Sequence, residues 1–277
     1  MTVRDAVRAA TEELAGAGCP SPRVDAEHLL ARALGLSHLE LYVDFDRPLR
    51  DPELAAYRAL LERRARREPL AHILGEWGFR RLTLKVDRRA LIPRPETEVV
   101  VERCLALLAE VAEPQVLDVG TGSGAIALAI ADEHPAAWVT AIDSSPDALA
   151  LARENLGRTG LGERVRLLAQ DLTAGLPGGP YDLVVSNPPY VEPEEIETLE
   201  PEVRDYEPRA ALVAAGQTEA VAHGARTVLK PGGWLVLEVA DGRAGVVADL
   251  LTELGFRAVR RSADLAGRER VVEGQWG

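Results

Sequence analysis

An Asn-Pro-Pro-Tyr sequence follows the strand-like segment 181–186. The side-chain carbonyl of Asn187 and the backbone carbonyl of Pro188 are two acceptors that can hold both hydrogens of a planar NH₂ group. They would orient its nitrogen and favour the positive charge that develops there during alkylation. Tyr190 can stack on a planar amide or base, and Pro188 and Pro189 stiffen the loop. A rigid strand-ending turn would explain the prolines but not the Asn and Tyr beside them.

A glycine-rich turn joins an earlier strand-like segment, 115–119, to the helix-like segment 125–133. Glycine alternates in it with small hydroxyl residues: Gly120, Thr121, Gly122, Ser123 and Gly124. Glycines let the backbone approach a ligand closely, and the start of a helix offers unpaired N–H donors. The spacing also fits the dinucleotide fingerprint with Ala125 in its last place, and a purely structural turn is a third interpretation.

Two carboxylates follow the next two strand-like segments. Asp143 ends the segment 138–143, where a carboxylate can accept from ribose hydroxyls or cap the following helix. Ser144 or Ser145 can cap that helix, so Asp143 is not needed as the cap. Asp171 lies just beyond the segment 165–169 and can accept from an adenine amino group or serve as a turn residue, with Leu172 as an apolar wall.

The Asn-Pro-Pro-Tyr loop decides which cofactor we expect. Hydride transfer needs no such arrangement, whereas methyl transfer to a planar nitrogen does, so we predict S-adenosyl-L-methionine as cofactor and S-adenosyl-L-homocysteine as product. No His lies near the loop in the sequence, and we assign no proton acceptor. Cys19 and Cys104 cannot form a metal cluster by themselves, and we expect no metal.

Strand-like and helix-like segments alternate from residue 115 onward. The near-continuous apolar strands are 115–119, 138–143, 165–169, 181–186 and 234–239, and the helices are 125–133, 146–158, 218–229 and 244–254. This alternation predicts an α/β fold with a mostly parallel, doubly wound sheet covered on both faces. The segments 257–261 and 270–273 are separated by a short connection, which predicts an antiparallel last strand.

The first 70 or so residues differ, because they show helical periodicity and few strand signals. We expect helices over 3–17, 23–34 and 52–68, the last capped by Asp51. Between 73 and 86 the spacing of the apolar residues changes to the alternation of a short β-hairpin. A further helix is expected over 99–110. These changes predict a helical domain over 1–72, a β-hairpin linker over 73–90 and a catalytic domain over 91–277.

Composition and charge exclude several classes of protein. The chain has 277 residues and a net charge of −12, distributed as +3 over 1–95 and −15 over 96–277. Broad nucleic-acid binding needs a basic surface, so no direct DNA binding is expected. No apolar run approaches the length of a membrane span, and no signal peptide is recognisable. We therefore expect a cytoplasmic protein. Only two asparagines are present, Asn155 and Asn187.

The sequence resembles the HemK/PrmC family of protein-glutamine methyltransferases almost from end to end. The resemblance rests on five segments: Leu-Ala-His-Ile-Leu-Gly at 70–75, Ile-Pro-Arg-Pro-Glu-Thr-Glu at 92–98, Asp-Val-Gly-Thr-Gly-Ser-Gly at 118–124, Ser-Asn-Pro-Pro-Tyr at 186–190 and Tyr-Glu-Pro-Arg-Ala-Ala-Leu at 206–212. It implies a helical N-terminal domain that recognises class I peptide chain release factors, followed by a class I S-adenosylmethionine-dependent methyltransferase domain. The expected reaction is methylation of the side-chain amide of the Gln in their Gly-Gly-Gln loop.

Carried over residue by residue, the resemblance implies cofactor contact at 120–124, Asp143 and Asn187, and substrate contact at 187–190. Leu172 stands where the family often has Trp. Two alternatives remain open: an adenine-amino nucleic-acid methyltransferase, which would use the same loop, and a non-catalytic S-adenosylmethionine-binding adaptor, which would not need Asn187 and Tyr190 intact.

Overall fold

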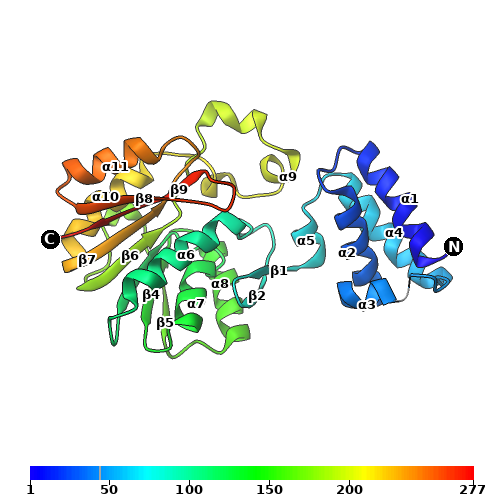
Figure 1. The fold of residues 1–277 in the computed structure, drawn as a ribbon, viewed down its shortest axis with the longest axis horizontal. Helices are drawn as coiled ribbons and strands as arrows, with labels where there is room; N and C mark the ends of the chain where they lie inside the picture. The colour runs from blue at the N-terminus through cyan, green and yellow to red at the C-terminus, as the bar shows by residue number, and fades with distance from the viewer. Residues whose placement is uncertain (44) are drawn as a thin grey trace. The chain divides into compact units, whose positions relative to one another are not determined.

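The computed structural model describes residues 1–43 and 45–277 (Figure 1). Its contacts divide the chain into two units. The first comprises Met1–Glu76 and Leu199–Tyr206, and the second comprises Trp77–Thr198 and Glu207–Gly277. The short segment 199–206 therefore belongs to the first unit although it lies far along the sequence. The boundaries drawn from the sequence do not include this return, and the division into 1–72, 73–90 and 91–277 stays a prediction.

The first unit is a bundle of helices with its own apolar core. Its helices are α1 (Val3–Gly16), α2 (Pro22–Leu34), α3 (His38–Val43), α4 (Asp51–Ala65), α5 (Leu70–Leu74) and α9 (Pro201–Arg204). The core includes Leu14, Leu29, Leu30 and Tyr57, all buried. The three long helices lie where helical periodicity predicted them. The expected cap at Asp51 is wrong: Arg50 is the N-cap residue, and the Glu53 carboxylate accepts its backbone N–H at 2.9 Å.

A network of buried and half-buried ion pairs joins α9 to the helices of this unit. The Arg64 side chain, only 3% exposed, lies 2.7 Å from both the Asp25 and the Glu202 carboxylates. Arg67 also pairs with Glu202 at 2.7 Å. Because each buried charge has a partner of opposite sign, the segment 199–206 is held by paired groups rather than by apolar contact alone.

The second unit is built on a seven-stranded sheet. Its strands are β3 (Gln115–Val119), β4 (Trp138–Asp143), β5 (Val165–Ala169), β6 (Tyr181–Ser186), β7 (Leu229–Glu238), β8 (Arg257–Ala263) and β9 (Glu269–Gln275). They lie in the order β5-β4-β3-β6-β7-β9-β8, and β9 runs in the opposite direction to the other six strands of this sheet. The predicted α/β class and the antiparallel end of the sheet are confirmed. A separate hairpin pairs β1 (Glu76–Phe79) with β2 (Leu82–Lys85).

Helices cover both faces of this sheet. They are α6 (Pro95–Leu108), α7 (Ala125–Glu133), α8 (Pro146–Thr159), α10 (Gln217–Val228) and α11 (Ala244–Glu253), with short 3-10 turns η1 (Leu172–Ala174), η2 (Pro193–Thr198) and η3 (Arg209–Ala211). Alternate residues of β3 enter different cores: Val116 packs in the core that contains α6 and α7, and Leu117 in the core that contains α10 and α11. This alternation buries the sheet on both sides, as its continuous apolar strands predicted.

Two boundaries differ from the sequence-based expectation, and the first of them affects the site. Helix α6 begins at Pro95, four residues before the predicted start, because the acidic Pro-Glu-Thr-Glu segment forms its first turn. Strand β7 begins at Leu229 rather than at 234. None of the helices among the described residues has the length and apolar character needed to cross a membrane.

Candidate active site

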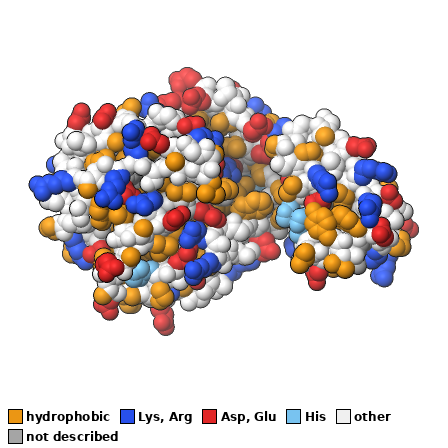
Figure 2. Space-filling model, viewed as in Figure 1, with side chains coloured by type: hydrophobic (Ala, Val, Ile, Leu, Met, Phe, Trp, Pro, Cys, Tyr) orange, Lys and Arg blue, Asp and Glu red, His pale blue; other side chains and the backbone are white. Residues whose placement is uncertain are grey.

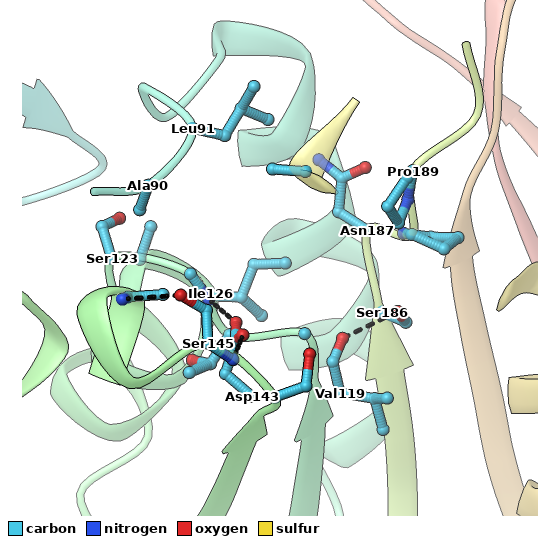
Figure 3. Close-up of a pocket in the computed structure, with 18 of the residues that line it drawn as sticks. Ala90, Leu91, Val119, Ser123, Ile126, Asp143, Ser145, Ser186, Asn187 and Pro189 are labelled. Atoms are coloured by element: carbon cyan, nitrogen blue, oxygen red, sulfur yellow. Dashed lines mark hydrogen bonds between the residues drawn. The ribbon is translucent and has the colours of Figure 1, made fainter. Parts of the chain in front are cut away.

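A cavity of about 220 Å³ opens at the carboxyl ends of the parallel strands in the second unit. Its lining includes nine residues predicted from the sequence: Gly120, Thr121, Gly122, Ser123, Asp143, Leu172, Asn187, Pro188 and Pro189. Figure 3 shows Ser123, Asp143 and Ser145 on one side of the cavity and Asn187 and Pro189 on the other. The fold thus places the glycine loop and the Asn-Pro-Pro loop in the lining of the same cavity. Gly124, Asp171 and Tyr190 are not part of this lining.

The glycine loop turns sharply from β3 into α7. Gly120 and Thr121 both donate their backbone N–H groups to the carbonyl oxygen of Ile142 at 2.9 Å, which ties the loop to the neighbouring strand. Gly122 has φ of 57°, in the left-handed region that favours glycine. Gly124 caps α7 with φ of 86°, and a Cβ there would lie 3.2 Å from Leu128 Cδ1. Gly124 thus serves close packing of the helix.

Asp143 connects the glycine loop to the turn after β4. Its Oδ2 accepts the backbone N–H of Gly122 and its Oδ1 accepts that of Ser145, both at 2.9 Å. Ser145 itself caps α8 through its hydroxyl, which accepts from Ala148 N at 3.2 Å. Asp143 is therefore not the helix cap, and each of its oxygens retains a lone pair that can accept from a hydroxyl group.

The turn after β5 presents Leu172 to the cavity, as predicted, together with Gln170, but not Asp171. Asp171 Oδ1 accepts both the backbone N–H and the hydroxyl of Thr173, at 2.8 and 2.7 Å, and so caps η1. Its neighbours Gln170 and Leu172 line the cavity instead. The turn interpretation accounts for what Asp171 does in this structure, and an adenine contact at this residue stays a prediction.

Asn187 is oriented by a chain of side chains behind it. Its Nδ2 donates to Thr97 Oγ1 at 3.2 Å, and that hydroxyl donates to Glu238 Oε2 at 2.7 Å. Thr97 lies in the first turn of α6, and Glu238 ends β7. With Nδ2 engaged in this way, Oδ1 is the atom that Asn187 offers to a ligand as an acceptor. Burial raises the pKa of Glu238 to about 7.

Tyr190 lies against a different hollow from its neighbours Asn187 and Pro188. That hollow is also lined by Gln217, Val239 and Arg243. Burial, followed by the nearby Glu238 carboxylate, raises the pKa of the Tyr190 phenol. The stacking role expected for Tyr190 stays a prediction.

A buried carboxyl, Asp118, lies beneath the glycine loop at the end of β3. It is fully buried, and its Oδ2 accepts the Thr121 hydroxyl at 2.6 Å. Burial raises the pKa of Asp118 to about 7, against the lowering effect of that hydrogen bond. Among the described residues, no group of three or more His, Cys, Asp or Glu side chains is placed to hold a metal ion.

The sequence did not reveal two functional residues, one in the segment before α6 and one in its first turn. Arg94 lines the cavity and forms a 2.6 Å ion pair with Glu207, a buried carboxylate that also accepts the backbone N–H of Ile92. Thr97, described above, was missed as well. The prolines and acidic residues of this segment were interpreted only as a helix start and as a mark of family resemblance, which gave no individual role to Arg94 or Thr97.

Asn155, the second of the two asparagines, supports the glycine loop from behind. It is fully buried in α8, and its Nδ2 donates to the carbonyl oxygens of Ser123 and Lys85. Its Oδ1 accepts the backbone N–H of Lys85 at 2.7 Å. The scarcity of asparagine in the chain was a signal that this residue has a specific role, although the sequence did not reveal which one.

Comparison with known proteins places this site in a family. The family model described as the PrmC N-terminal domain matches residues 5–75, and that of the methyltransferase small domain matches residues 99–255. The release factor glutamine methyltransferase of Caulobacter vibrioides is 43% identical, over 99% of this chain and 96% of its own length. The chain belongs to the release factor glutamine methyltransferase family.

A second member agrees with this assignment, and a solved structure shares the fold. The release factor glutamine methyltransferase of Deinococcus radiodurans is 45% identical over 98% of both chains. A methyltransferase from Pyrococcus furiosus shares the fold, with a TM-score of 0.50 over 70% of this chain and 88% of its own, at 19% identity. The predicted family and the predicted methyltransferase fold are both confirmed, and the cavity at the strand ends belongs to a methyltransferase of this family.

Proposed function

We propose that this protein transfers a methyl group from S-adenosylmethionine to the side-chain amide nitrogen of the Gln in the Gly-Gly-Gln loop of class I release factors. One observation carries the proposal furthest. The Asn187 amide is held through Nδ2 by Thr97, which leaves Oδ1 as its acceptor, and Asn187 and Pro188 both line the cavity that the glycine loop also lines. Two acceptors in that position suit an NH₂ group better than a hydroxyl or a carboxylate.

The cavity fits the adenosyl cofactor in the chemistry of its walls. Asp143 retains acceptor capacity for ribose hydroxyls, Leu172 and Ile126 are apolar, and the glycine loop exposes backbone without side chains in the way. We assign cofactor binding to Gly120–Gly124, Asp143, Leu172 and Asn187, with Gly124 acting through the packing of α7. When bound, S-adenosylmethionine supplies an electrophilic methyl group.

The residues of the chain contribute orientation and electrostatics. Asn187 Oδ1 and the Pro188 carbonyl each accept one hydrogen of the substrate amide, which fixes the direction of the nitrogen lone pair. As that nitrogen gains positive charge, both acceptors interact with it more strongly, so they favour the transition state over the ground state. The alkylated nitrogen then loses one of its protons readily, and no side chain is required to take it.

The helical unit is the part that we assign to recognition of the release factor. The family model of the PrmC N-terminal domain covers residues 5–75, most of that unit. We place the protein in the cytoplasm, where translation takes place.

An adenine-amino nucleic-acid methyltransferase would use the same loop, but residues 96–277 carry a net charge of −15. On the face drawn in Figure 2, acidic and basic side chains are interspersed.

A methyl-transfer assay with labelled S-adenosylmethionine tests this function. The substrates are a class I release factor, the same factor with its loop Gln changed to Ala, and duplex DNA, each with the native enzyme and with Asn187→Ala. We expect label in the unmodified factor alone and a loss of at least ~100-fold on Asn187→Ala. Label in the Gln→Ala factor or in DNA would contradict the proposed substrate, and an unchanged rate for Asn187→Ala would contradict the proposed role of the loop.

A further inference from the structure

Three side chains from three separate elements form a single hydrogen-bonded line in the second unit. Asn187 follows β6, Thr97 lies in the first turn of α6, and Glu238 ends β7. The Asn187 amide donates to the Thr97 hydroxyl at 3.2 Å, and that hydroxyl donates to the Glu238 carboxyl at 2.7 Å. Thr97 is 5% exposed and Glu238 is 2% exposed. Buried polar groups are ordinarily hydrogen-bonded. Here the chain of hydrogen bonds ends at Asn187, a residue of the proposed reaction site.

The donor and acceptor capacities of the three groups fix the direction of both hydrogen bonds. An ionised carboxylate can only accept, so the single hydrogen of the Thr97 hydroxyl is committed to Glu238. The hydroxyl then has only lone pairs to offer Asn187, and only the Nδ2 end of the amide can meet them. Nδ2 is therefore turned toward Thr97, and Oδ1 is left to face a substrate.

We propose that Thr97 and Glu238 are positioning residues that hold the Asn187 amide with its carbonyl oxygen toward the substrate nitrogen. This inference rests on the proposed function, in which Asn187 Oδ1 accepts a hydrogen of the substrate NH₂ group. Neither residue touches the reacting atoms. Their effect is to exclude the rotated amide, in which an NH₂ group would face the NH₂ group of the substrate and neither could accept.

Protonation of Glu238 removes the constraint that orients the Asn187 amide. A protonated carboxyl can donate to the Thr97 hydroxyl, which can then turn its own hydrogen toward Asn187 and accept the rotated amide. The charged and titratable groups around Glu238 are Arg94 and Glu96 beside the start of α6, Tyr190 after β6, and Arg270 on β9. Burial raises the pKa of Glu238, the hydrogen bond from Thr97 and the two arginines lower it, and Glu96 raises it further, which leaves a pKa of about 7.

The test is the pH dependence of kcat for release-factor methylation at saturating S-adenosylmethionine, between pH 6 and 8, for native enzyme, Thr97→Val, Thr97→Ser and Glu238→Gln. We expect native kcat to fall as the pH is lowered through about 7, and the Glu238→Gln profile to be flat. Thr97→Val should lower kcat by ~10- to 100-fold at pH 8 while the substrate KM changes little. Thr97→Ser, which keeps the hydroxyl, should restore most of the rate.

Two matched substitutions control for general effects of the changes. Glu273→Gln alters another buried glutamate of the same sheet, one that pairs with Arg103. Thr252→Val alters a threonine of α11 whose hydroxyl donates to a backbone carbonyl. Both should keep the native shape of the pH profile.

The possible failures can be told apart. If Asn187→Ala abolishes transfer but Thr97→Val stays within about twofold of native kcat, the positioning inference is wrong and the proposed function stands. If Glu238→Gln keeps the native slope near pH 7, the slope belongs to another group, such as Asp118, and the inference is again overturned. If Asn187→Ala itself transfers normally, the proposed role of the Asn-Pro-Pro-Tyr loop is wrong, and the positioning inference, which rests on that role, is overturned with it.

Discussion

The backbone N–H of Gly122 donates to Oδ2 of Asp143 over 2.9 Å. The carboxylate that we expect to accept from a ribose therefore also fixes the conformation of the loop on the same side of the cavity. Binding of the cofactor and shape of the loop depend on one side chain, and a change at Asp143 should affect both.

Asp143→Asn is the change that tests this dependence. One of the two carboxylate oxygens becomes an NH₂ group, which must then face either the Gly122 or the Ser145 backbone N–H. We expect S-adenosylmethionine to bind at least ~10-fold more weakly and the free energy of unfolding to fall by about 1–3 kcal/mol. Calorimetric binding and urea unfolding measure the two effects. Asp147→Asn, at an exposed position of α8, is the control. A variant with weakened binding and native stability would show that Asp143 acts on the ligand alone.

Asp118 should make the stability of the cofactor-free protein depend on pH. Its folded-state pKa, about 7, lies above its ordinary value of 3.8, so the folded protein holds this proton more tightly than the unfolded chain does. The contribution of the Asp118 carboxyl to the free energy of unfolding is complete below pH 4 and is lost as the pH rises to 7. Asp118→Asn cannot ionise, so relative to native protein its stability should rise by about 2–4 kcal/mol over that range. Urea unfolding at pH 4.5, 6 and 7.5 measures this difference.

The same measurement on Asp249→Asn, which changes an exposed carboxylate of α11, shows how much of any slope is general to acidic residues. A constant difference between native protein and Asp118→Asn from pH 4.5 to 7.5 would mean that Asp118 does not titrate in this window.

Arg64 should be among the most sensitive positions of the helical unit. Its replacement by Ala would leave the buried carboxylate of Asp25 and the half-buried carboxylate of Glu202 without their common partner. The expected loss in free energy of unfolding is about 3–5 kcal/mol, the usual cost of breaking a buried ion pair from one side. Arg58→Ala, at an exposed position of the same helix, should change stability by less than about 0.5 kcal/mol. Equal effects of the two substitutions would show that the pairing is not what holds α9.

Much of the sheet could be predicted because its strands are short apolar runs bounded by turn residues. The strand Tyr181–Ser186 and the helix Ala125–Glu133 have the bounds that the sequence pattern predicted. The meeting of the glycine loop with Asn187 also followed, since parallel strands end at the same edge. Helices α3 and α5 were missed because each is only one or two turns long and shows no usable period.

The supporting side chains could not be predicted in the same way. Thr97 and Asn187 are 90 residues apart, and Thr97 and Glu238 are 141 apart. Their pairing depends on where α6 crosses the ends of β6 and β7, which no local pattern records. Asp171 illustrates the opposite difficulty, because one short local motif suits both a turn and a ligand contact. Only in the folded protein is it evident that Thr173 donates to its carboxylate.

The return of residues 199–206 to the helical unit means that the polypeptide crosses between the two units at three peptide bonds rather than one. The helical unit is thus not an appendage that can be removed by shortening the chain from its N-terminus. A chain beginning at Trp77 would still carry Glu200 and Glu202, now without Arg64 and Arg67. The stretch between the Asn-Pro-Pro-Tyr loop and α10 would hold unpaired acidic groups. A swap of helical units between family members must therefore exchange both pieces of sequence together.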